Sequence, residues 1–246
     1  MMRLAAALLL LALPGLAHAG APFRTDDAGM LEPGGWEVDL STSATRTSSG
    51  WAGVAPATEA NYGVSKGVQV HVVLPLGYVQ PRHGRAGMGL GDAEFGVKVR
   101  LFTGGESGLP DIAAYPLVEA PVGNQAMGFS TGHTQVFLPL WLQKTVGDWT
   151  LFGGGGYWIN PGIGNKDYVF TGIGAQRKVT EDLSLGVELF YQGASAAGQR
   201  SSTGGNIGAA YDISEAIHLL GSIGTGLTNR SASNLTSYYL GLQFTF

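Results

Sequence analysis

The sequence predicts an all-β fold: a closed antiparallel transmembrane β-barrel of about 12 strands, preceded by a short N-terminal lead-in or plug. Two observations predict it. The chain of 246 residues has 40 dispersed glycines, only 13% charged residues and no cysteine. From residue 36 onward, short segments of alternating apolar and polar residues follow one another. Such alternation puts one kind of side chain on each face, and a membrane barrel turns the apolar face to lipid and the polar face to its lumen.

The end of the chain is itself a strand of this kind, which a soluble domain seldom leaves at an edge. Residues 237–246 alternate strictly and finish on an aromatic residue. An exposed apolar edge invites aggregation, whereas a closed barrel pairs its last strand with its first. The spacing of Tyr239, Gly241, Phe244 and Phe246 also resembles the terminal assembly signal of outer-membrane barrels. We therefore expect the barrel insertion machinery of Gram-negative bacteria as a partner; the alternative is an edge strand of a soluble sandwich.

The first 19 residues have the form of a signal peptide. A basic start at Arg3 precedes an apolar run at residues 4–13, and Ala17 and Ala19 form a small-x-small cleavage site. The run is too short for a membrane helix, which needs about 20 residues. We expect cleavage after Ala19, export, and a place in the cell outer membrane.

Residues 20–35 show no periodicity and form the expected periplasmic or lumenal segment. Its charged residues are Arg24, Asp26, Asp27 and Glu32. They lack the spacing of a calcium loop, so we expect no metal and no cofactor. No charged or proline-rich linker divides the remainder, and residues 36–246 are expected to form one barrel domain.

The expected strands are consecutive, and their connections mostly alternate in length, with the link at 103–110 as the one exception. Short turns at 65–67 and 147–148 follow even-numbered strands, while longer loops at 47–54 and 80–91 follow odd-numbered ones. This alternation is typical of outer-membrane barrels, with short periplasmic turns and longer external loops. The expected strands lie at residues 36–41, 56–64, 68–78, 93–101, 111–122, 134–146, 149–158, 168–178, 183–193, 206–213, 217–227 and 235–246.

Charged and polar residues at inward positions are the expected lumen and selectivity residues. The strand at 93–101 alternates most sharply, with Phe95 and Val97 opposed to Glu94 and Lys98. Unpaired buried ions are costly, so these groups must be wet or paired across the lumen. The expected lumen residues are Glu37, Asp39, His71, Asp92, Glu94, Lys98, Arg100, Glu119 and Glu188.

A plug is one way to pair these charges. If the lead-in folds back into the pore, Asp26 and Asp27 are the expected partners of Lys98 and Arg100. Arg24 and Glu32 are the other candidate plug contacts. The alternative is that the inward charges only fill and solvate a closed interior.

No catalytic motif emerges, and we expect no enzyme. His71 lacks a nearby serine and acid, and the glycines at 153–156 lack the Lys-Ser/Thr that follows them in a phosphate loop. Basic residues are not clustered, which excludes a nucleic-acid partner.

Several short motifs together resemble a family, the outer-membrane proteins of the "MetA-pathway of phenol degradation". They are Thr-Asp-Asp-Ala at 25–28, Glu-Pro-Gly at 32–34 and Gly-Leu-Gly-Asp-Ala-Glu at 89–94. The sequence departs at 121–123, which reads Pro-Val-Gly instead of Pro-Thr-Gly, and lacks the family's asparagine before the Gly-Tyr pair at 156–157. The resemblance spans the mature chain and implies a transporter-like barrel linked to uptake of aromatic compounds.

The expected function is passive, porin-like passage of small molecules through the outer membrane, with hydrophobic or aromatic compounds as the expected solutes. The expected partners are outer-membrane lipid, the insertion machinery and a small-molecule solute. Two alternatives stay open: a structural or adhesive barrel without transport, and a lipid-modifying barrel enzyme.

Overall fold

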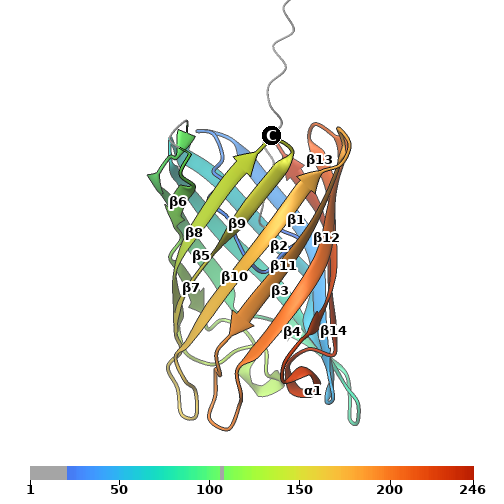
Figure 1. Cartoon of the computed structure of the whole chain (residues 1–246). Helices are drawn as coiled ribbons and strands as arrows, with labels where there is room; N and C mark the ends of the chain where they lie inside the picture. Colours follow the sequence, from blue (N-terminus) through green and yellow to red (C-terminus); the bar gives the residue numbers. More distant parts are fainter. Residues whose placement is uncertain (1–20, 106–107) are drawn as a thin grey trace, which may run out of the picture.

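The computed structural model describes residues 21–105 and 108–246, so the expected signal peptide lies outside the described residues. The chain forms a closed antiparallel barrel (Figure 1). Within the described ranges, 14 strands fill 12 positions around the barrel, which confirms the predicted fold class. Among the described residues, no helix is long and apolar enough to span a membrane.

The strands run in order around the barrel, and each of two positions is shared by two strands that lie end to end. The first pair, β4 and β5, lies along β3; the second, β6 and β7, lies between β5 and β8. The strands are β1 (Trp36–Thr47), β2 (Gly50–Ser65), β3 (Val68–Pro81), β4 (Gly87–Leu90), β5 (Ala93–Phe102), β6 (Asp111–Ala114), β7 (Leu117–Ala120), β8 (Gln135–Val146), β9 (Trp149–Ile159), β10 (Tyr168–Lys178), β11 (Leu183–Gln192), β12 (Ser202–Ser214), β13 (Ile217–Gly226) and β14 (Thr236–Thr245).

The barrel closes where its first strand meets its last. Strands β1 and β14 pair from Glu37 opposite Thr245 to Arg46 opposite Thr236. Beyond this ladder, Trp36 N donates to Phe246 O at 2.7 Å and Phe246 N donates to Trp36 O at 3.0 Å. Closure leaves neither strand with a free edge, which is what a sheet needs inside a membrane.

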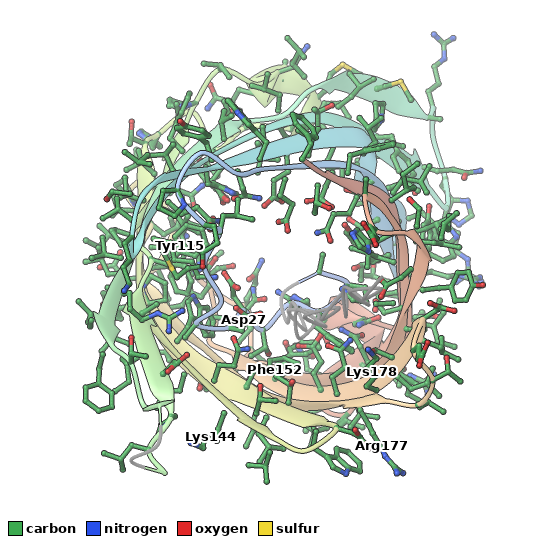
Figure 2. The ribbon with its side chains drawn as sticks, turned by 90° about the horizontal axis from the view of Figure 1, so that it is seen from above. Asp27, Tyr115, Lys144, Phe152, Arg177 and Lys178 are labelled. Atoms are coloured by element: carbon green, nitrogen blue, oxygen red, sulfur yellow. The ribbon has the colours of Figure 1, made fainter. Side chains whose placement is uncertain are left out.

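The two faces of the wall differ as the alternation predicts. On β5, Phe95 and Val97 are 51% and 41% exposed on the outer surface, while Lys98 is only 5% exposed. In Figure 2, which looks down the barrel, Asp27 and Phe152 lie inside the ring of strands and Arg177 points outward. Apolar side chains therefore cover the outer surface, and many of the polar and charged side chains point into the lumen.

The first hairpin is longer than predicted. The expected loop at 47–54 is wrong, because β2 begins at Gly50 and only Ser48 and Ser49 form the turn. Residues 50–54 pair with both β1 and β3, but Gly50, Ala52 and Gly53 give too little contrast between the two faces for the sequence to show a strand. The turn is also held from outside, since Ser48 N donates to Ser231 O at 2.8 Å in the short helix α1 (Arg230–Ser233).

The expected loop at 80–91 is partly wrong for a similar reason. Strand β3 continues to Pro81, and β4 returns along it from Gly87 opposite Val79 to Leu90 opposite Leu76. The loop between β7 and β8 contains a single turn of 3₁₀ helix, η2 (Gln125–Met127). It lies at the same end of the barrel as α1, opposite the C terminus (Figure 1).

Candidate functional site

The lumen contains the start of the described chain. Residues 21–35, here called the N-terminal segment, run inside the barrel before β1 begins. The side chains of Thr25 and Asp27 are almost completely buried, at 0% and 1% exposure. The backbone N–H groups of Arg24 and Thr25 donate to Oε1 and Oε2 of Glu188, each at 2.9 Å. One carboxylate of the wall thus holds two consecutive amides of the segment.

Two bases of β5 hold the next residues of the segment. Lys98 Nζ lies 3.1 Å from Asp26 Oδ1 and 3.5 Å from Asp27 Oδ1. Arg100 donates through Nη2 to the carbonyl oxygen of Ala28 at 2.6 Å. Burial raises the pKa of the Asp26 carboxyl above its ordinary value, and the Lys98 ammonium opposes this shift by favouring the charged form.

Backbone contacts fix both ends of the segment. Near its start, Ser222 Oγ donates to the carbonyl oxygen of Pro22 at 2.7 Å. Near its end, Gly34 N donates to Gly63 O at 2.7 Å, and Gly63 N donates to Gly35 O at 3.0 Å. The segment is therefore joined to the wall along its length, and the last contacts pin it beside β2.

A cavity of about 450 Å³ remains between the segment and the wall. One side of it carries carboxylates from neighbouring strands, here called the acidic wall: Glu37, Asp39, Glu59 and Glu94. His71 lies among them, with Nδ1 3.1 Å from Glu59 Oε1 and Nε2 2.8 Å from Glu94 Oε1. The imidazole therefore bridges two carboxylates of different strands.

The other side of the cavity is built of rings, here called the aromatic wall. Its members are Phe137, Trp141, Trp158, Tyr168 and Phe170. Trp158 of β9 stacks on Phe137 of β8 with ring centroids 4.7 Å apart, and on Tyr168 of β10 at 6.0 Å. The three rings are directly opposed across neighbouring strands. The lumen thus has two chemically different sides.

The structure places the predicted lumen residues in different surroundings. Glu37, Asp39, His71, Glu94 and Lys98 line the cavity. The remaining four do not line it.

Each of those four lies elsewhere on the inner side of the wall. Asp92 accepts hydrogen bonds from Gly123 N at 3.0 Å and Thr131 N at 3.3 Å, so it holds the loop between β7 and β8. Arg100 faces Asp111, with Nη1 2.6 Å from Oδ2. Glu188 is buried beneath the N-terminal segment, and Glu119 lies opposite Glu94 on β7.

The structure also gives the positions of the residues predicted to form the plug and the assembly signal. Arg24, Asp26 and Asp27 lie in the lumen, whereas Glu32 is exposed in the turn before β1. Of the terminal residues, Tyr239 lines the cavity and Gly241 is buried. Phe244 is half-buried and Phe246 is 74% exposed.

Sequence reasoning missed several residues of the cavity. Glu59, Asn61 and Gln69 are part of it; Gln69 Nε2 donates to Asn61 Oδ1 at 3.1 Å, and Gln69 Oε1 accepts from Leu31 N at 3.0 Å. The signal was available, because Glu59 and Asn61 alternate with Ala60 and Tyr62.

Of the comparisons with known proteins, the one with solved structures supports the fold. No family model and no curated protein sequence matches the chain. An outer membrane channel from Pseudomonas putida F1 superposes with a TM-score of 0.73 at 16% identity, covering 89% of this chain and 98% of that one. The KdgM porin superposes with a TM-score of 0.61 at 11% identity, covering 85% and 99%. This chain therefore has the fold of outer-membrane β-barrels, among them a channel and a porin.

Proposed function

We propose that this protein is an outer-membrane channel for passive passage of small molecules, narrowed by its own N-terminal segment. The observation that carries the proposal is the cavity of about 450 Å³ inside a closed barrel, lined by charged and polar side chains on one side and by aromatic rings on the other, and bounded by the segment. A barrel of 12 positions lies between small barrels filled by side chains and the 16-stranded porins that leave an aqueous channel. Charged groups that line such a pore select among solutes.

The proposal includes the location of the protein in the outer membrane and the way it is exported and inserted there. A signal peptide at 1–19 delivers the chain, the aromatic end of the last strand is read by the insertion machinery, and lipid surrounds the apolar outer surface. The resemblance to the phenol-degradation barrels and the aromatic wall both favour aromatic solutes. We expect no enzymatic activity, because no catalytic motif emerges in the sequence.

Liposome swelling tests the channel. Purified protein in proteoliposomes should admit arabinose faster than sucrose, and sucrose faster than raffinose, because the cavity limits the size of the solute. Liposomes with heat-denatured protein are the control. No swelling with any sugar would favour a structural or adhesive barrel, and turnover of the liposome lipids, followed by chromatography, would reveal the lipid-modifying enzyme.

A further inference from the structure

We propose that the cavity binds aromatic cations, meaning a flat ring that carries a positively charged nitrogen. This inference rests on the proposed channel function and names the solute class of the same lumen. Its basis is the position of the two walls. Strands β2 and β10 are opposite each other, because the same number of strand positions separates them in both directions around the barrel. Strands β1 and β9 are opposite by the same count, so the carboxylates of β1 and β2 face the rings of β9 and β10 across one cavity of about 450 Å³, and Glu94 of β5 lies on the arc between the two walls.

The aromatic wall offers a surface against which another ring can pack. Phe137, Trp158 and Tyr168 form a ladder whose neighbouring ring planes are inclined by only 9° and 13°. All three rings line the cavity. Aromatic rings bind through offset stacking or edge contacts, and the ladder repeats this surface over three strands. Trp158 has Phe137 against one face and Tyr168 against the other, so a planar solute in the cavity meets the edges of the ladder.

The protein's own Arg24 shows that this side of the lumen accommodates a cation. Its guanidinium carbon lies 4.5 Å from the ring centroid of Phe190 and 5.2 Å from that of Phe170. Nη2 of the same group donates to Gln192 Oε1 at 2.7 Å. A cation within about 6 Å of a ring centroid is attracted by the negative face of the ring, and more strongly where water is excluded.

The opposite side of the cavity carries an excess of negative charge. The acidic wall has four carboxylates, and they outnumber the one base among them, His71, which contacts Glu59 and Glu94. Lys98 is paired with Asp26 and Asp27 of the N-terminal segment, so its positive charge does little to neutralise the acidic wall. Asp39 is 3% exposed, and its Oδ1 atom has no hydrogen-bond partner among the described residues. A buried acceptor of this kind is stabilised by a donor that a solute brings.

These observations predict an order of affinity for three kinds of solute that have the same aromatic ring and differ in charge. A ring with an ammonium group packs against the aromatic wall and turns its charge toward the acidic wall. A neutral ring gains only the contact with the aromatic wall, and a ring with a carboxylate is repelled by the acidic wall. The cavity volume lies within the range of roughly 300–1,000 Å³ in which ligand pockets usually fall.

Isothermal titration of the detergent-solubilised protein tests the ranking with benzylammonium, benzyl alcohol and benzoate. Benzylammonium should bind roughly tenfold or more tightly than the other two. Glu59→Gln should weaken benzylammonium about tenfold while it leaves benzyl alcohol unchanged. Trp158→Leu should weaken both, and Phe137→Leu provides a second change in the same ladder if the first variant does not fold.

Two variants serve as matched controls, and heat modifiability on gels checks the folding of every variant. Tyr157→Leu removes the neighbouring ring, which points outward from the same strand, and Glu181→Gln removes a carboxylate in an exposed turn. Both should bind all three probes like the unaltered protein. Equal affinity for the three probes overturns the inference about aromatic cations, even if proteoliposomes swell and so support the proposed channel function. Selective binding without any swelling supports the site and refutes the channel.

Discussion

At the scale of single residues, Glu188 shows how one inward carboxylate organises the lumen. It is 2% exposed and accepts hydrogen bonds from the backbone amides of Arg24 and Thr25. The side chain of Asn206 on the next strand donates a third hydrogen bond to it. A buried carboxylate is costly unless it is hydrogen-bonded. The N-terminal segment therefore adds two donors to the one from the wall, so loss of the segment would leave the Glu188 carboxylate of β11 less well stabilised.

The first prediction concerns the two faces of β5. Val97→Arg places a charge on the outer surface and should destabilise the barrel in lipid vesicles by about 2–4 kcal/mol if the residue lies near the midplane. Glu94→Gln keeps the shape of an inward residue and should cost much less. Urea unfolding in vesicles measures both. Equal losses of stability would contradict the assignment of inside and outside.

The second prediction uses a glycine that the N-terminal segment approaches closely. A Cβ at Gly172 would collide with the side chain of Thr25, whereas a Cβ at Gly221 would meet nothing closer than 3.8 Å. Gly172→Ala should displace the segment. Trypsin should then cleave after Arg24 about tenfold faster, because cleavage follows the population of the open state.

Gly221→Ala is the matched control and should be cleaved like the unaltered protein. If Gly172→Ala is equally resistant while it remains folded, the segment is not held at this point.

At the scale of elements, the regular strands could be predicted and their interruptions could not. Strand β11 alternates without a break, and the predicted segment at 183–193 closely matches Leu183–Gln192. The split between β6 and β7 falls at Tyr115 and Pro116, where Pro116 cannot donate to the ladder. The sequence does not show that the same barrel position resumes at Leu117, because that depends on pairing with β5 and β8.

The third prediction concerns β14. Deleting Phe246 removes the pair of backbone hydrogen bonds with Trp36 that completes closure, each worth about 1 kcal/mol. Its side chain is largely exposed, so little burial is lost. If the terminal residue is also the assembly signal, inserted protein should nevertheless fall to a minor fraction.

Heat-modifiable protein in the membrane fraction measures this outcome. Ile163→Ala, which truncates an exposed apolar side chain in the loop between β9 and β10, is the control and should insert normally. Normal insertion of the deletion variant would refute the role of Phe246.

At the scale of the whole molecule, the polar half of the lumen was predictable and the aromatic half was not. Alternation identified Glu37, Asp39, Glu94 and Lys98 as inward. The face of β9 was obscured by four consecutive glycines at 153–156, which give no contrast between the two sides. The aromatic wall appears only when β8, β9 and β10 lie side by side, because its rings meet across strands.

The fourth prediction concerns conductance. Deleting residues 20–34 behind the signal peptide should raise single-channel conductance roughly twofold or more, because the segment occupies the lumen. Arg100→Ala removes the hydrogen bond to Ala28 and should give a smaller increase. Cations should pass in preference to anions in all variants, since carboxylates outnumber bases around the cavity.

Arg177→Ala, which removes an outward-facing arginine at the end of β10, is the control and should leave conductance unchanged. Unchanged conductance and ion selectivity in both the deletion and Arg100→Ala would refute the role of the segment.

The N-terminal segment is covalently joined to β1, and this connection determines how the segment would return to the lumen after leaving it. The contacts of Gly34 and Gly35 with Gly63 hold the base of the segment against β2. Residues 21–33 that leave the lumen therefore stay within a short tether of it, at an effective concentration on the order of millimolar. Reclosure is then a first-order step that does not depend on protein concentration, so open intervals should be brief and should recur at the same rate in a single isolated molecule.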